Sequence, residues 1–326
     1  MNSRSSGVRR CRATPSTRLL LAVAMLCAAS SAAAENKPDG RWAVSRDYSI
    51  AIVGSDGKIG AVTNSGADHK PSWSADGRRF TFFRAFHYGS GFERWRTKIG
   101  VVGVDGKGER LLTSGQYPDF NPTWMRDGTN RIVFNRYLGG STWKNQVYMT
   151  TPDASPGDEV LISDPRYGFF EWANSTLKDG RILVDRIDNI PTRSSYLLTP
   201  NPGGKPKYEK LKRPTGNAWH KLSVSPSETK VAYMLDHDGW VHTYEDAVIA
   251  WAEFDVARRR IVNQKTVTER HKGYVDEYPR WSRDEKFILY DSNRSGRYQV
   301  YAFNLESGTT TVVSAGQYPN AEATPY

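Results

Sequence analysis

The sequence has few cysteines and no apolar run that could cross a membrane. Its two cysteines, Cys11 and Cys27, both lie within the first 34 of 326 residues. The rest of the chain therefore has no disulfide, no cysteine nucleophile and no cysteine metal site. The uncharged run Leu19–Ala34 is 16 residues long, against the roughly 20 that span a bilayer. These absences exclude a disulfide scaffold and a polytopic membrane protein.

The N-terminal segment has the pattern of a secretory signal peptide. Met1–Arg18 carries five arginines and no acidic residue, and the apolar run after it ends in three alanines at Ala34. A basic region, an apolar region and small residues in this order are typical of a cleaved export signal. We expect cleavage after Ala34, leaving residues 35–326 as one domain without a transmembrane segment, located in the periplasm or secreted.

The charge of the remaining chain is modest. Without the five signal arginines, 40 basic residues face 35 acidic ones, so the formal net charge falls from +10 to +5. The lysine- and arginine-rich tail of a nucleic-acid-binding protein is absent, and export also argues against that partner. A small positive surplus favours anionic ligands.

One motif recurs along the chain. Its full form is a proline, a tryptophan and an Asp-Gly turn in that order, and each copy precedes an apolar or alternating strand. The copies at 172–180 and 278–285 keep part of this form, and the copy at 222–228 keeps only its general shape. The copies are His69–Gly77, Asn121–Gly128, Trp172–Gly180, Leu222–Glu228 and Tyr278–Glu285. The predicted strands after them are Arg79–Phe83, Ile132–Phe134, Ile182–Val184, Val231–Leu235 and Phe287–Tyr290. Further strands such as Lys98–Val104 and Arg110–Leu112, joined by a hairpin at Asp105-Gly106, make each unit a four-stranded meander.

The spacing of these units predicts a six-bladed propeller. The turn positions fall at residues 39, 76, 127, 179, 227 and 284, and units after the first are separated by 51, 52, 48 and 57 residues. About 50 residues per four-stranded unit is the size of a propeller blade. The segment 316–320 repeats 115–119, so the chain ends in the middle of a motif. We therefore expect one blade to take its inner strand from the C-terminus and its other strands from 41–63, which would remove exposed sheet edges.

These residues resemble the TolB-like, WD-type β-propeller repeats of bacterial periplasmic proteins over the whole mature chain. The carrying residues are the P-x-W-S-x-D-G motif and the Tyr290–Arg294 segment. The resemblance implies an all-β, six-bladed propeller of four-stranded antiparallel blades, but not a particular function. We interpret Trp73, Trp124, Trp172 and Trp281 as blade-core aromatics. Asp76, Asp127 and Asp179 are interpreted as turn residues that bind nearby backbone amides.

The candidate binding face is the one reached by the loops that enter the inner strands and leave the second strands. Basic side chains end four successive second strands, and histidines and tyrosines surround them. The arginines are Arg46, Arg84, Arg136 and Arg186, and the other residues are His69, His87, Tyr88, Tyr117, Tyr137, Tyr167, His220, Tyr278 and Tyr318. Guanidinium groups can bind carboxylates through two donors, and aromatic rings stack on sugars. The alternative is that the arginines pair with blade acids such as Asp47, Asp185 and Glu171.

Two functions remain open. The first is a binding module that holds an anionic glycan or a partner peptide, with Arg46, Arg84, Tyr88 and Tyr137 among its ligand contacts. The second follows from similarity to propeller lyases that cleave uronate polysaccharides by β-elimination, which needs a carboxylate neutraliser, a base and an acid. Arg136 or Arg186 with His69 would then neutralise the carboxylate. His87 or His220 would be the base, and Tyr117 or Tyr167 the base or acid.

Cofactors and metals are not expected. No phosphate-binding loop or G-x-S-x-G motif occurs. The polar segment Asp236–Asp246 could coordinate a divalent ion but lacks a calcium-loop spacing. The expected partners are an acidic polysaccharide or a cell-envelope protein, and the expected state is a monomer.

Overall fold

The structure is a computed structural model. It describes residues 41–46, 48–54, 58–87, 94–139, 144–167, 170–189, 192–214, 218–236, 247–271, 273–313 and 324–325. Within these ranges no helix has the length and apolar character needed to cross a membrane.

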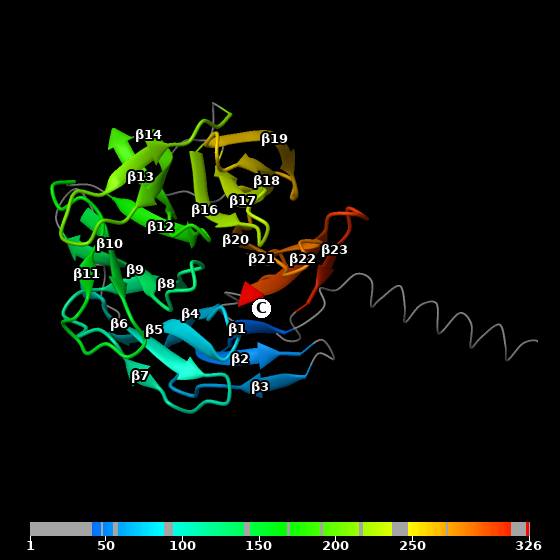
Figure 1. Ribbon diagram of the computed structural model, residues 1–326. Helices are drawn as coiled ribbons and strands as arrows, with labels where there is room; N and C mark the ends of the chain where they lie inside the picture. Colours follow the sequence, from blue (N-terminus) through cyan, green and yellow to red (C-terminus); the bar gives the residue numbers. More distant parts are fainter. Residues whose placement is uncertain are drawn as a thin grey trace, which may run out of the picture.

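Six four-stranded antiparallel sheets are arranged around a central axis, as Figure 1 shows. Blade one contains β1 (Trp42–Arg46), β2 (Ser49–Val53) and β3 (Ile59–Ala61), and the two-residue β24 (Thr324–Pro325) pairs with β1. Blade two consists of β4 (Asp68–Trp73), β5 (Arg79–His87), β6 (Arg96–Gly103) and β7 (Arg110–Leu111). Blade three consists of β8 (Asp119–Trp124), β9 (Ile132–Gly139), β10 (Lys144–Thr150) and β11 (Val160–Leu161).

The second half of the ring repeats this order. Blade four consists of β12 (Glu171–Thr176), β13 (Ile182–Asn189), β14 (Thr192–Thr199) and β15 (Lys207–Lys210). Blade five consists of β16 (Ala218–Val224), β17 (Lys230–Asp236), β18 (Val248–Asp255) and β19 (Arg260–Thr266). Blade six consists of β20 (Asp276–Trp281), β21 (Phe287–Ser292), β22 (Gln299–Asn304) and β23 (Thr310–Val312). The predicted all-β, six-bladed architecture is confirmed.

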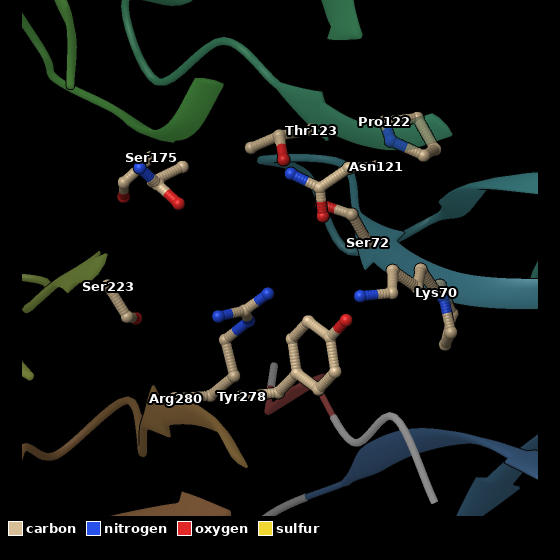
Figure 2. A pocket seen from close by; sticks show the side chains of 11 residues that line it. Lys70, Ser72, Asn121, Pro122, Thr123, Ser175, Ser223, Tyr278 and Arg280 are labelled. Carbon is tan, nitrogen blue, oxygen red and sulfur yellow. The ribbon is translucent and has the colours of Figure 1, made fainter. Parts of the chain in front are cut away.

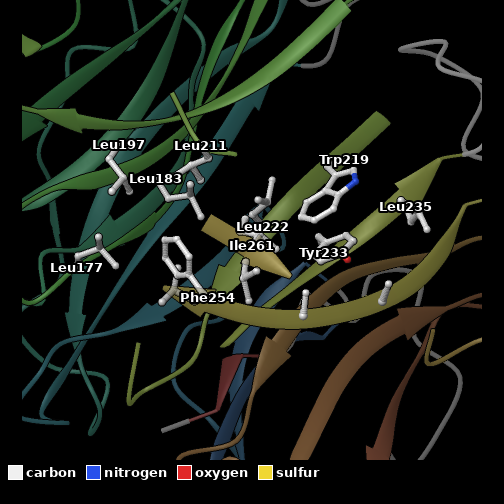
Figure 3. Packing of buried hydrophobic residues seen from close by; sticks show 14 of the residues in the cluster. Leu177, Leu183, Leu197, Leu211, Trp219, Leu222, Tyr233, Leu235, Phe254 and Ile261 are labelled. Carbon is white, nitrogen blue, oxygen red and sulfur yellow. The ribbon is translucent and has the colours of Figure 1, made fainter. Parts of the chain in front are cut away.

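The core lies between blades, because both faces of each sheet are apolar. Successive residues of a strand point to opposite faces. In β5, Phe80 and Phe82 join a cluster shared with blade one, whereas Phe83 joins a cluster shared with blade three. In the described residues, one such cluster fills each junction between neighbouring blades. The cluster between blades four and five, with Trp219 and Tyr233 stacked 3.7 Å apart, is shown in Figure 3.

The recurring motif residues hold the inner strands in place. Trp73, Trp124 and Trp281 are buried. The Trp124 indole donates to the Ser72 carbonyl of the preceding blade at 3.0 Å, and Trp281 donates likewise to Ser223 at 2.9 Å. The motif tryptophan therefore both fills the core and links neighbouring inner strands.

The motif aspartates form the predicted turns. Their carboxylates accept the backbone N–H two residues later: Asp76 from Arg78, Asp127 from Thr129 and Asp179 from Arg181, each at 3.0 Å. This interpretation of the aspartates is confirmed.

Trp172 differs from the other motif tryptophans. It is the second residue of β12, only partly buried and stacked on Phe170 with ring centroids 5.6 Å apart. The end of this inner strand is Thr176, whose hydroxyl donates to the Trp124 carbonyl at 2.8 Å. The reason is spacing, since Asp179 follows Trp172 by seven positions, whereas Asp127 follows Trp124 by three.

Several second strands are longer than predicted. The strand expected over Arg79–Phe83 continues to His87, because pairing with β6 extends to His87 opposite Arg96. The prediction ended where the apolar alternation ended, but backbone pairing continues through polar residues toward the rim.

Candidate functional site

The rim arginines lie opposite acidic residues of the adjacent inner strand. Strand register pairs Asp68 with Arg84, Asp119 with Arg136, and Glu171 with Arg186. In blade six, the cross-strand partner of Asp276 is Ser292, and Arg294 reaches back to the carboxylate at 2.8 Å. A charge pair at the start of the inner strand is thus a repeated feature of the blades.

Arg84 and Arg136 are held by their acidic partners from two sides. The Arg84 Nε lies 2.6 Å from Asp68, and its Nη1 lies 2.6 Å from Glu109. Arg136 lies 2.7 Å from Asp119 and 3.3 Å from Glu159, and its side chain is 9% exposed. Despite burial, hydrogen bonds and the charges of these carboxylates raise the pKa of both arginines above the usual value. These charges are largely neutralised within the fold.

The arginines do lie beside blade acids, and Glu171, one of the acids named from the sequence, is opposite Arg186. The partners of Arg84 and Arg136 are Asp68 and Asp119, which were not named. Asp185 is buried and instead accepts from Ser195 and Asn174, both at 2.8 Å. Asp47 lies outside the described residues. Cross-strand register decides the pairing, and register is not visible in the spacing of charges along the chain.

Blade four contains a looser version of the same pair. Arg186 lies between the rings of Tyr167 and Tyr208, 3.7 and 4.2 Å from their centroids. Among the described residues, neither carboxylate oxygen of Glu171 forms a hydrogen bond of good geometry. The Nε of Arg186 does not form one either. Burial raises the pKa of Glu171 to about 7, although Arg186 and Tyr208 oppose the shift.

The three histidines predicted for the site differ in how deeply they are buried. His69 is 6% exposed and lies between Phe83 and Tyr48, with ring centroids 4.9 and 5.2 Å away. His220 is 1% exposed, and its Nδ1 lies 2.6 Å from Arg193. Burial and the nearby cations hold the pKa of His220 well below its usual value. His87, by contrast, is exposed at the end of β5.

The remaining predicted residues are divided between the core and the rim. Tyr137 is a buried member of the cluster between blades two and three. Tyr117 is 36% exposed and lies 5.5 Å from the Arg136 guanidinium. Arg46 is half-buried at the end of β1. Tyr88 and Tyr318 lie outside the described residues.

The inner strands bulge where they face the central axis. Lys70, Asn121, Lys221 and Tyr278 have positive φ angles of 49 to 53°, and strand register shifts at each of these positions. Such a backbone conformation is costly for a residue other than glycine and is maintained by its surroundings. The repeated bulge places polar and charged side chains beside the axis.

These side chains surround an axial cavity of about 120 Å³. Figure 2 shows the Lys70 amine, the Arg280 guanidinium and the Asn121 amide directed into the same space. The lining residues are Lys70, Pro71, Ser72, Asn121, Pro122, Thr123, Asn174, Ser175, Ser223, Tyr278 and Arg280. Hydroxyl and cationic donors therefore predominate, and the cavity is suited to an anionic group.

Two lysines share one aromatic ring beside this cavity. The Lys70 amine lies 3.1 Å from the centroid of Tyr278, and the Lys221 amine lies 4.7 Å from the same centroid. Lys221 also lies 4.7 Å from the Trp172 ring. Burial and the Lys70 cation hold the pKa of Lys221 well below its usual value.

Lys70, Lys221 and Arg280 were not among the residues predicted from the sequence. For Arg280, the available signal was the repeat position immediately before the last residue of each inner strand, which is polar in five blades. Its occupants are Ser72, Thr123, Ser175, Ser223 and Arg280. Arginine is the exception in a series of small hydroxyl residues. This position was interpreted as part of the structural motif.

Metal binding has no candidate in the described residues, where no group of three or more His, Cys, Asp or Glu side chains could hold an ion. The sequence had suggested the segment Asp236–Asp246, of which residues 237–246 lie outside the described ranges.

Six four-stranded blades around a polar axial cavity define a β-propeller. The chain is structurally similar to TolB-like six-bladed propellers, as its motifs predicted. It matches TolB from Acinetobacter baumannii with a TM-score of 0.64 and 15% identity, over 87% of this chain and 66% of that one. The chain thus spans about two thirds of the length of that TolB.

Two further structures show the same fold. A structure assigned as a TolB from Agrobacterium tumefaciens gives a TM-score of 0.60 at 11% identity, over 89% of this chain and 94% of that one. Kuenenia stuttgartiensis hydrazine synthase gives a TM-score of 0.62 at 13% identity, over 89% of this chain and 46% of that one. No family model and no curated protein sequence matches the chain. At these identities the likeness establishes the fold alone.

Removing Arg136 should strongly destabilise the protein. Arg136→Met leaves the fully buried Asp119 carboxylate without its ion pair, which typically costs about 3–5 kcal/mol. The control Arg166→Met, whose side chain is 71% exposed beside Asp164, should cost less than about 1 kcal/mol. Urea unfolding measures both. Similar small losses would show that the Arg136–Asp119 pair is not structural.

Glu171 should make stability depend on pH. Its folded pKa of about 7 lies above the ordinary value of 4.5, so the stability it contributes is complete below pH 4.5 and is lost as pH rises to about 7. The expected loss is on the order of 3 kcal/mol. Glu171→Gln should remove this loss, and urea unfolding from pH 4 to 8 tests it. Parallel pH curves for the two proteins would contradict the assignment.

Proposed function

We propose that this protein is an exported, TolB-like binding propeller that holds an anionic ligand at the axis of the ring. The ligand is an acidic glycan or the acidic end of a partner peptide from the cell envelope. The observation that carries this proposal is the convergence of Lys70 and Arg280 on the axial cavity beside several hydroxyl groups. The proposal of export is based on the signal-like pattern of residues 1–34. We expect the exported protein to be a monomer.

The axial cavity supports this function better than the rim. Arg84 and Arg136 already pair with two carboxylates each, so a ligand carboxylate would have to displace an existing partner. Lys70 and Arg280 are half-buried on the cavity wall. Charge-assisted hydrogen bonds formed in such partly desolvated sites are stronger than those at an exposed surface.

We place lyase activity second, because no observation in the described residues favours it. A polysaccharide lyase needs a neutraliser and a base that a sugar chain can reach. Of the histidines proposed for these roles, His69 and His220 are buried. His87 remains exposed. The ultraviolet absorbance of an unsaturated uronate product, followed with the same acidic glycans, distinguishes turnover from binding.

Binding should depend on the cavity cations. Lys70→Met and Arg280→Met should each weaken binding by about 10- to 100-fold, the effect of losing one charge-assisted hydrogen bond. Calorimetry with an oligogalacturonate and with a short acidic peptide measures this and identifies the ligand class. Arg258→Met, whose side chain is 82% exposed near Asp255, is the control and should bind like the native protein. Unchanged affinity in both cavity variants, or no binding of either ligand, would refute the proposal.

We also propose that the two chain ends close the ring within blade one. Thr324 and Pro325 pair antiparallel with Ala43 and Trp42. The cluster between blades six and one, which includes Trp42 and Phe287, packs next to this junction.

The closing strand should contribute to stability. Deleting residues 324–326 should lower the melting temperature by several degrees, because a strand pair is lost and β1 becomes a sheet edge. Calorimetry of the full chain with and without residues 324–326 tests this, and removal of residues 1–34 from the full chain is the control that leaves the transition unchanged. An unaltered transition after the C-terminal deletion would contradict closure by this strand.

A further inference from the structure

The axial site has a charge that depends on one lysine. Lys70 and Arg280 contribute positive charges to the cavity wall. Glu277, on the same strand as Arg280, is an acidic neighbour of Lys221. Lys221 adjoins the cavity beside Tyr278. The residues lining the cavity therefore contribute two positive charges, from Lys70 and Arg280, and protonation of the adjoining Lys221 adds a third close by. An anion with two charges would neutralise the two charges on the wall.

The surroundings of Lys221 oppose its protonation while the site holds no anion. The groups that face Lys221 are Lys70 from β4, Arg193 from β14, Glu277 and Arg280 from β20, and the adjacent His220. The cations outnumber the single carboxylate, and the charge of Arg193 is only partly offset by the buried Asp185. The aromatic faces of Tyr278 and Trp172, each 4.7 Å from the amine, are the favourable partners of the ammonium form.

Cavity size limits what can enter. A volume of about 120 Å³ has room for one tetrahedral anion with a few water molecules, so the charged end group of a sugar chain can enter while the rest of the chain stays outside. The hydroxyls of Ser72, Thr123 and Ser223 line the same space as the two cations. Several donors on different sides of a small cavity are better matched to the spread oxygens of a tetrahedral group than to a planar carboxylate.

We propose that the axial cavity takes a doubly charged tetrahedral oxyanion, the class of a phosphate monoester at the end of a sugar chain, and that Lys221 takes up a proton when it binds. This inference rests on the proposed function and specifies the group that enters the cavity. Binding and protonation reinforce each other, because a dianion beside Lys221 favours its charged form. By linkage, the anion then binds more tightly wherever Lys221 is protonated.

The ligand class is tested with sugars of similar size. Calorimetry at pH 7 compares glucose 6-phosphate with glucuronate. The dianion should bind at least tenfold more tightly than the monoanion, and Lys70→Met should reduce this preference. If glucuronate binds as tightly, the anion-binding function stands and the dianion assignment is wrong. If neither sugar nor sulfate binds, the axial anion site itself is refuted.

Proton uptake is tested with sulfate, which stays doubly charged between pH 6.5 and 9. Calorimetry in two buffers of different ionisation enthalpy counts the protons taken up. Uptake should approach one proton per sulfate in the pH range where free Lys221 is neutral, and affinity should fall by up to tenfold per pH unit there. Lys221→Met should bind more weakly with no uptake. Lys221→Arg, which stays charged, should bind sulfate without uptake.

The variants separate this inference from the general function. Sulfate binding without proton uptake in the native protein would overturn the role of Lys221 while leaving the anion site intact. Proton uptake that persists in both Lys221 variants would assign the proton to another group and equally overturn it. Circular dichroism and urea unfolding establish that each variant remains folded, and Lys98→Met, on the second blade at β6, is the matched control that should behave like the native protein.

Discussion

The structure depends on one constraint: every blade has two apolar faces and must bury both against neighbours. A single four-stranded sheet of this kind cannot be stable alone, whereas a closed ring provides each blade with two partners. Phe80 and Phe83 of one strand illustrate this, since they serve different blade junctions. The motif tryptophans pack in these junctions, and the indoles of Trp124 and Trp281 donate hydrogen bonds to the inner strand of the preceding blade, next to the axis. Blade packing and the lining of the axis are thus set by the same few residues.

This arrangement gives the charged residues two different roles. Toward the rim, Arg84 and Arg136 lie opposite acidic residues of the inner strand. Their ion pairs link the start of the inner strand to the second strand of the same blade. Along the axis, the bulge at Lys70, Lys221 and Tyr278 turns polar side chains toward a shared cavity. Blade four differs from this rim pattern. Glu171 and Arg186 do not form a direct ion pair, and the Glu171 carboxyl group remains buried. Charges that repeat with the blades serve the fold, and those that break the repeat are the better candidates for function.

More of the fold than of the candidate site could be predicted from the sequence. The spacing of the Asp-Gly turns was sufficient for six blades, since each copy of the motif specifies one sheet. The second strands were predicted too short, because hydrogen bonding continues past the apolar residues of β5. Trp172 was grouped with the other tryptophans, although its longer distance from Asp179 already distinguished it. For the site, the sequence grouped Tyr117, Tyr167, Arg136 and Arg186 on one face without assigning contacts among them. The structure places Tyr117 beside Arg136 and Tyr167 beside Arg186. The acidic partners of Arg84 and Arg136 were not predicted.

By itself, the sequence determined the repeat, its period and the turn aspartates, because these follow from local spacing. Only the tertiary structure decided which charges meet. Asp68 and Arg84 are 16 residues apart and pair through strand register. Lys70 and Tyr278 come from different blades and meet through the inner-strand bulge and the curvature of the ring. A contact across the axis depends on the sum of all blade rotations, which no segment of the sequence contains alone.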